Sequence, residues 1–165
     1  MDASRPKNLI HCGVGVLARI PDWPIALIGR FSIAAIFWKS GQTKVQGFAI
    51  DIVSGEFQWG LPQLSDAAVT LFRDEYRLPL LPPETAAPMA AFAEHLFPLL
   101  ILIGVATRLS AVALLVMTAT IQLLVYPDAY PTHGVWATVL IFLIARGPGA
   151  VSVDHLLARR LGLEM

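Results

Sequence analysis

The sequence has one cysteine, Cys12, among its 165 residues, and no excess of charge of either sign. A single cysteine excludes an intramolecular disulfide, a CxxC redox pair and a cysteine-rich metal site, so thiol exchange through this chain's own residues is not expected. A net charge of zero offers no basic face, which excludes nucleic acid as a partner. There is also no glycine-rich nucleotide-binding motif. Cys12 is interpreted as an inert thiol.

Charged side chains are scarce. They make up 15% of the residues and hydrophobic ones 56%, whereas an ordinary soluble domain has about 25% charged residues. Between Ala86 and Tyr126 only Glu94 and Arg108 are charged. Arg108 divides this run into two stretches, each close to the roughly 20 residues that a helix needs to cross a bilayer. The run therefore predicts a transmembrane hairpin with Arg108 at its turn and the lipid bilayer as its surroundings.

The predicted fold is all-α: an integral membrane four-helix bundle with a long outer loop. The loop, 41–87, is expected to contain an amphipathic surface helix from Asp66 to Arg77, capped by Ser65 and lying on the membrane face or across the bundle mouth. A further short helix is expected after Ser152. With no repeat or linker, residues 1–165 form one domain whose spans are predicted at about 23–39, 88–106, 109–126 and 131–146.

Lysine and arginine are unevenly distributed between the two sides of this bundle. Seven lie on the side of the termini: Arg5, Lys7, Arg19, Arg108, Arg146, Arg159 and Arg160. Four lie on the other side: Lys39, Lys44, Arg73 and Arg77. Because cytoplasmic segments carry the excess of positive residues, both termini are predicted to be cytoplasmic. Gly104 and the many alanines permit close helix contacts, including those of a homo-oligomer.

Arg30 and Glu94 are the charges expected within the spans. Counted at about 1.5 Å per residue from opposite faces, they differ by only about 6 Å in depth, so we predict that they pair. A lone charge near the bilayer centre costs about 2.5–3.5 kcal/mol on insertion scales. The pair can simply fix helix register, or Glu94 can act as a proton carrier or ligand group. The sequence leaves both alternatives open.

Polar and aromatic residues gather near the outer ends of the spans. They define a candidate outer pocket for a quinone-like or other small amphipathic ligand, although interfacial packing explains the same residues. No spacing typical of metal ligands is present, so no metal site is predicted. The candidate pocket residues are Trp38, His95, Gln122, Tyr126, Tyr130 and His133.

Several motifs, in their order and spacing, resemble the DoxX family of small bacterial membrane proteins, over about Trp23 to Leu157. The resemblance implies a four-helix bundle in the bacterial inner membrane. The family is named for a subunit associated with thiosulfate:quinone oxidoreductase, and relatives have been linked to thiol redox. The long loop resembles a branch often encoded beside enzymes that modify small metal-binding peptides. The motifs are Gly29–Phe31, Phe37–Gly41, Phe72–Glu84, Ala91–Glu94, Leu102–Leu109 and Arg146–Asp154.

Two functions follow as expectations. In the first, the chain is a redox-associated membrane subunit, with Arg30 and Glu94 lining a quinone or proton site and a protein partner meeting the loop at Arg73, Asp74, Glu75 and Tyr76. Any redox centre would then come from a bound quinone or the partner. In the second, it is a non-catalytic accessory or transport protein that handles a small peptide, metal or metabolite beneath the loop helix.

Overall fold

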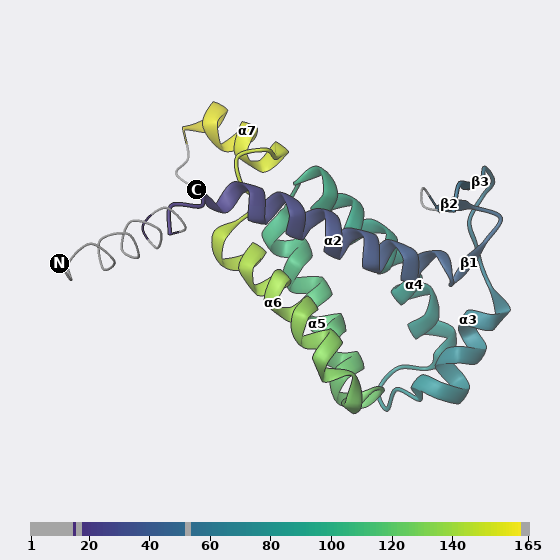
Figure 1. The fold of residues 1–165 in the computed structure, drawn as a ribbon. Helices are drawn as coiled ribbons and strands as arrows, with labels where there is room; N and C mark the ends of the chain where they lie inside the picture. The colour runs from purple at the N-terminus through teal and green to yellow at the C-terminus, as the bar shows by residue number, and fades with distance from the viewer. Residues whose placement is uncertain (1–14, 16–17, 52–53, 163–165) are drawn as a thin grey trace, which may run out of the picture.

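The structure is a computed structural model that describes residues 15, 18–51 and 54–162; Arg5, Lys7 and Cys12 lie outside them. The described chain is mostly helical (Figure 1). Its α-helices are α2 (Asp22–Gln42), α3 (Asp66–Leu71), α4 (Pro83–Ile103), α5 (Thr107–Leu124), α6 (Tyr130–Arg146) and α7 (Val153–Leu161). Between them lie the strands β1 (Val45–Gln46), β2 (Ala49–Asp51), β3 (Glu56–Gln58) and β4 (Gln63–Leu64), the π-helix η1 (Phe72–Tyr76) and the 3-10 helix η2 (Pro127–Ala129).

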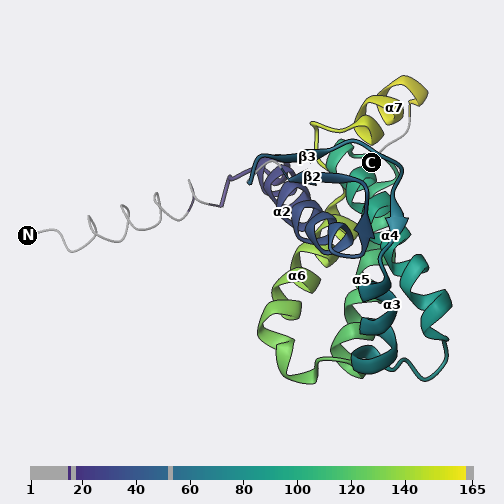
Figure 2. The same cartoon turned by 90° about the vertical axis from the view of Figure 1, so that its right-hand side faces the viewer.

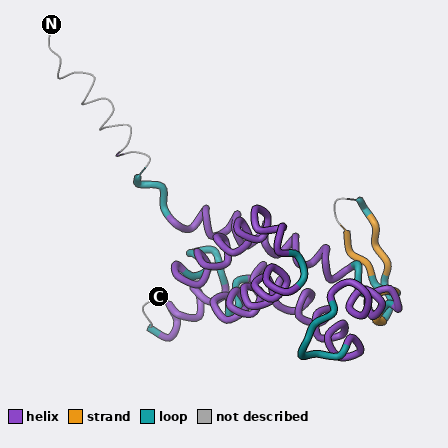
Figure 3. Tube along the Cα trace, turned by 90° about the horizontal axis from the view of Figure 1, so that it is seen from below, coloured by secondary structure: helices purple, strands orange, loops and turns teal. Residues whose placement is uncertain are grey.

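The four long helices pack side by side. Helix α2 contacts α4 and α6, and α5 contacts the same two helices, so the four form a closed group around a shared apolar core (Figures 1 and 3). Ile33, Phe37, Ile101, Leu114 and Leu140 are almost completely buried there. Helices α4 and α5 are long and apolar enough to cross a membrane. The architecture is therefore a mostly helical one with two candidate membrane-spanning helices.

The four segments predicted as spans are all helical, and the largest difference lies at the start of α4. The span was expected from about residue 88, but α4 begins at Pro83 and continues through Pro88. Proline suits the first turn of a helix, where its missing N–H is not needed. Pro83 therefore begins α4, and the helix starts about one and a half turns earlier than expected.

The outer loop contains strands, so the prediction of an all-α fold is wrong for this segment. Strand β1 pairs antiparallel with β4, and β2 with β3 (Figure 2). Gly55 makes the turn between β2 and β3 at a φ of 74°, which other residues rarely adopt. A side chain on Gly60 would meet the Gly47 carbonyl oxygen at 2.3 Å, so glycine permits the loop to fold back on itself.

The predicted loop helix is present and capped as expected. The Ser65 hydroxyl accepts a hydrogen bond from the Ala68 N–H at 3.2 Å, and α3 passes directly into η1. Ala68 and Phe72 are buried against Ala86 and Ala87 of α4. The helix therefore packs against the first turns of α4. At the other end of the molecule, Ser152 caps α7 through the His155 N–H, also as predicted.

Candidate functional site

Arg30 lies on the buried side of α2, and it does not pair with Glu94. Its guanidinium donates to four carbonyl oxygens: Ile101 at 2.8 Å, Leu102 at 2.6 Å, Pro148 at 3.1 Å and Val151 at 2.5 Å. Two of these carbonyls belong to the last turn of α4, whose final carbonyls have no partner within the helix. Arg30 thus closes the end of α4 and fixes the loop that follows α6. We call this region the Arg30 end.

Gly104 and Asp154 also belong to the Arg30 end. Gly104 has a φ of 74°, and a side chain there would lie 2.5 Å from the Cβ of Ser152. The Asp154 carboxylate accepts from the N–H groups of Ala106 and Thr107 at 2.8 and 2.9 Å, and so caps the start of α5. The motifs 102–109 and 146–154 therefore lie in contact, and this contact joins the turn between α4 and α5 to the segment between α6 and α7.

Glu94 pairs with Lys44 instead, at the opposite end of α2. Lys44 Nζ lies 2.7 Å from Glu94 Oε2, an ion-pair contact that is not aligned as a hydrogen bond. Lys44 also donates to the hydroxyl of Ser40 at 3.1 Å, and both charged residues are only 2–3% exposed. Lys44, the first basic residue of the outer loop, thus lies among the helices and neutralises the buried Glu94 carboxylate. We call this region the Glu94 end.

The predicted Arg30–Glu94 pair was wrong because the helix register was misjudged. Gly41 is the part of α2 that faces Glu94: a side chain at Gly41 would lie 3.1 Å from the Cβ of Glu94. Arg30 lies 11 residues earlier in α2, about 16 Å away along the helix axis. The depth estimate took the two helices to end level, but Gly41 lies near the end of α2, so about three turns of α4 before Glu94 extend past that end.

His95 and Gln42 join the outer loop to the Glu94 end. The Ile50 N–H donates to Gln42 Oε1 at 2.8 Å, so the Gln42 amide nitrogen faces His95 Nε2, also at 2.8 Å. His95 Nδ1 lies 2.7 Å from the Ala91 carbonyl oxygen, which can only accept. The network therefore assigns a proton to Nδ1 and leaves Nε2 as the acceptor for Gln42. The Trp38 indole donates to the Ile50 carbonyl oxygen at 3.0 Å and fixes the same strand.

Two tyrosines connect η1 to the end of α5. The Tyr76 and Tyr126 rings meet edge to face at 5.8 Å, and the Tyr126 hydroxyl donates to the Glu75 carboxylate. Burial raises the pKa of the Tyr76 phenol, and the negative charges of Glu94 and Glu75 raise it further. Tyr76 therefore remains a neutral hydrogen-bonding group close to the buried ion pair.

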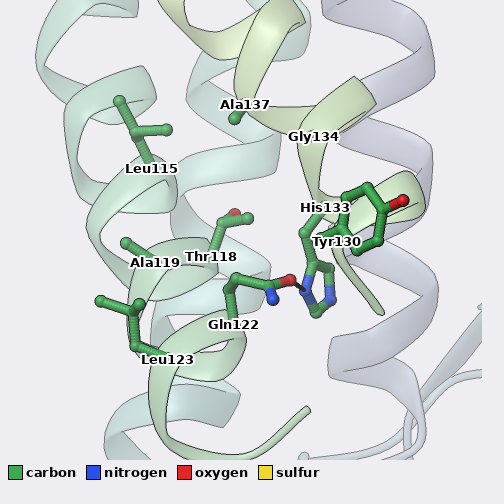
Figure 4. Close-up of a pocket in the computed structure, with 9 residues that line it drawn as sticks. All are labelled: Leu115, Thr118, Ala119, Gln122, Leu123, Tyr130, His133, Gly134 and Ala137. Atoms are coloured by element: carbon green, nitrogen blue, oxygen red, sulfur yellow. Dashed lines mark hydrogen bonds between the residues drawn. The ribbon is translucent and has the colours of Figure 1, made fainter. Parts of the chain in front are cut away.

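The six residues of the predicted outer pocket fall into separate groups. Trp38 and His95 stack edge to face at 5.0 Å beside the Glu94 end, and Tyr126 belongs to the tyrosine contact. Gln122, Tyr130 and His133 line a different pocket of about 380 Å³ between α5 and α6 (Figure 4). The single pocket predicted from the sequence is therefore wrong, and only these last three residues share a cavity.

The α5–α6 pocket is mostly apolar and has one polar pair. Its remaining lining residues are Leu115, Thr118, Ala119, Leu123, Gly134 and Ala137. Gln122 donates its amide N–H to the Pro127 carbonyl oxygen at 2.6 Å, so its oxygen faces His133 Nδ1 at 2.7 Å. His133 Nδ1 is consequently the donor. Its Nε2 has no hydrogen-bond partner among the described residues.

The four loop residues expected to face a partner differ in their exposure and contacts. Arg73 and Asp74 are exposed, and Arg73 forms an exposed ion pair with Glu84 at 2.7 Å. Glu75 and Tyr76 instead contact Tyr126. Within the described ranges no group of three or more His, Cys, Asp or Glu side chains is placed to hold a metal ion.

Comparison with known proteins agrees with these motifs. Residues 25–127, well over half of the chain, match the DoxX family model. The chain belongs to the DoxX family. This DoxX protein is 26% identical over 141 residues to an uncharacterized protein of Haemophilus influenzae, an alignment covering 81% of this chain and 83% of that relative. No solved structure matches it. Together with the apolar helices α4 and α5, family membership indicates a membrane protein.

Lys44 is the main site residue of this DoxX protein that sequence reasoning missed. It was counted as a loop charge because it follows the first span directly. A signal was available: Lys44 follows Ser40 by four residues at the end of the first span, and a buried carboxylate needs a cation. Asp154 was also missed, because the helix that it caps, α5, begins 47 residues earlier in the chain and no local pattern links the two.

Proposed function

We propose that this DoxX protein is an integral protein of the bacterial inner membrane, with α2, α4, α5 and α6 as four spanning helices and both termini in the cytoplasm. Large apolar side chains on the outer faces of these helices support the placement: Phe31 is 66% exposed, Phe92 67% and Val135 63%. Such surfaces are costly in water and favourable in lipid. The positive residues near Arg108 and α7 support the orientation.

Within that membrane, we propose that the protein binds a lipid-soluble ligand of the quinone class and works with a protein partner in a redox system. The α5–α6 pocket is the observation that carries this proposal. Its apolar walls suit a quinone ring and part of a prenyl tail, and the Gln122–His133 pair provides polar contact for one carbonyl. A pocket between helices at the membrane-facing surface is accessible to a ligand dissolved in lipid.

The polar pair is positioned to handle a proton. With Nδ1–H donated to Gln122, the Nε2 atom of neutral His133 accepts from a hydroxyl, and protonated His133 donates to a carbonyl. A bound quinone would supply the two-electron chemistry, with electrons delivered by the partner. The role of Gln122 is to hold the imidazole in one tautomer, since its own amide is fixed by the Pro127 carbonyl oxygen.

The outer loop offers a surface for the partner. Phe57 of β3 and the following Trp59 and Leu61 are 55, 78 and 84% exposed. We call these three exposed apolar side chains the loop stripe, and exposed apolar groups of this kind mark interaction sites. The exposed Arg73 and Asp74 add charge to the same loop. We place the partner contact on this stripe and its neighbouring charges.

Solvent extraction of the purified protein tests the proposal. The protein in mild detergent is expected to carry close to one quinone per chain, and His133→Leu or Gln122→Leu to lose most of it. Thr120→Val is the matched control, because Thr120 lies on α5 outside the pocket and bonds only the Val116 carbonyl oxygen. Equal quinone content in all four proteins, or none in the wild type, would refute the quinone site.

A non-catalytic accessory or transport role is the second candidate, and the Glu94 end favours it. Lys44 and Glu94 are sealed from solvent and tie the loop to the helices, as expected of a structural anchor beneath a binding loop. This role predicts no quinone, no donor-dependent reduction, and loss of ligand handling when Arg73 or Asp74 is reversed in charge. Unchanged ligand handling in those reversals would exclude it.

A further inference from the structure

A small cationic pocket lies at the Arg30 end, on the side away from the outer loop. It has a volume of about 150 Å³ and lies where α5 begins, α6 ends and α7 starts. Among the residues that the structure describes, the titratable side chains that line it are all basic. The lining residues are Arg108, Arg146, Gly147, Pro148, Gly149, Ala150 and His155.

Arg108 has no partner in the described part of the chain. It forms no ion pair or hydrogen bond there, in contrast to Arg30 with four carbonyls and Arg73 with Glu84. Gly147 makes room for it: a side chain on Gly147 would lie 3.4 Å from Arg108 Nη2. The guanidinium therefore lies against bare backbone, with its donors available to a ligand.

The other polar groups of the pocket are also available. Arg146 is 3.7 Å from Asp22, a loose ion pair between side chains that are 65 and 53% exposed. The His155 ring has no partner among the described residues, since only its backbone N–H bonds Ser152. The N–H groups of Gly149 and Ala150 likewise have no acceptor there. Two guanidinium groups, an imidazole and free N–H groups thus surround one small space.

We propose that this pocket binds a phosphate group. Two planar guanidinium forks match the oxygens of phosphate, and the volume suits one tetrahedral oxyanion. Leu156, Leu157 and Leu161 of the adjacent α7 are 49–70% exposed, next to Arg159 and Arg160. An amphipathic helix of this kind lies in a membrane interface. The headgroup of an anionic phospholipid and a free phosphate ester share the required chemistry.

The proposal rests on the membrane placement but not on the quinone site. Thermal unfolding of the full chain in detergent tests it, with phosphatidylglycerol, phosphatidylcholine or inorganic phosphate added at matched ionic strength. Phosphatidylglycerol is expected to raise the Tm of the wild type, and Arg108→Gln to weaken its apparent affinity at least tenfold. Arg108→Lys should recover part of it. Arg160→Gln is the matched control, because Arg160 lies on α7 outside the pocket.

Each outcome either supports or overturns the phosphate pocket and, where it supports it, identifies the source of the phosphate. A saturable effect of inorganic phosphate that Arg108→Gln removes, without preference for the lipid, assigns a free phosphate ester. An effect of phosphatidylglycerol alone assigns the headgroup. Equal shifts with phosphatidylcholine, or equal loss in Arg108→Gln and Arg160→Gln, would overturn the pocket. If Arg108→Gln does not fold, His155→Gln provides the same comparison. Quinone content is measured on other variants, so either proposal can fail alone.

Discussion

Arg30 and Glu94, two buried charges of this DoxX protein, are neutralised in different ways. Arg30 donates to carbonyl oxygens from a helix end and a loop, and no carboxylate of the described residues bonds it. Glu94 is neutralised by a single side chain, that of Lys44, which enters from the outer loop. Fixed backbone carbonyl groups hold Arg30 without a direct ion pair, whereas the ion pair of Glu94 can be altered by movement of the loop. The Arg30 end is therefore expected to be rigid and the Glu94 end adjustable.

Removing Arg30 should have the largest effect on stability. Arg30→Met leaves four carbonyl oxygens without their donor, and each buried unsatisfied group costs about 1–3 kcal/mol. We expect a loss of about 5 kcal/mol or more, measured by denaturant titration in micelles. Arg30→Lys should lose less, because an ammonium group restores some of the bonds. A loss below about 1 kcal/mol in Arg30→Met would show that the Arg30 end is not held by these contacts.

The Glu94 end should respond differently when both partners are changed. Glu94→Gln or Lys44→Met alone leaves a buried charge unpaired and should cost about 3–5 kcal/mol. The double variant Lys44→Met/Glu94→Gln removes both charges, and its stability should return close to that of the wild type. Denaturant titration of all four proteins gives the coupling. Additive losses in the double variant would mean that the two groups do not act as a pair.

The helices could be predicted from the sequence, but the partners of the two charges could not. Apolar runs and capping residues such as Ser65 are local signals, and the structure confirms the segments that they predict. The partner of Glu94 depends on register between α2 and α4, which Gly41 sets through close contact. A short loop strand such as β2 is fixed by Trp38 and Gln42, far from any local pattern. The register between helices and the long-range hydrogen bonds therefore could not be predicted from the sequence.

Glycine substitutions compare how tightly the two ends are packed. Gly104→Ala should cost more than Gly41→Ala, because it combines a φ of 74° with a Cβ 2.5 Å from that of Ser152. At Gly41 the new methyl group would lie 2.8 Å from a ring carbon of His95, and overpacking of this kind costs about 1–3 kcal/mol. Gly134→Ala is the control: nothing lies within 4 Å, so it should be neutral or stabilising. Thermal unfolding gives the order, and equal costs at both ends would contradict the proposed difference in rigidity.

The smallest expected effect is at the contact between the loop and α5. Tyr126→Phe removes the bond to Glu75 at an exposed site and should cost about 0.5–1.5 kcal/mol at pH 7. Its pH dependence is more informative. The pKa values of both Tyr76 and Tyr126 are raised by burial first, so the folded state holds their protons more tightly than the unfolded chain. Their contribution to stability is complete below about pH 10 and declines as the pH rises above that value.

Replacing both tyrosines, in Tyr76→Phe/Tyr126→Phe, should therefore flatten the stability curve above pH 10, while the Arg30 end contributes equally in both proteins. Unfolding midpoints between pH 8 and 11 measure the difference. If the double variant keeps the full alkaline decline, the decline arises elsewhere in the molecule, and the tyrosine contact does not hold the outer loop against α5 at alkaline pH.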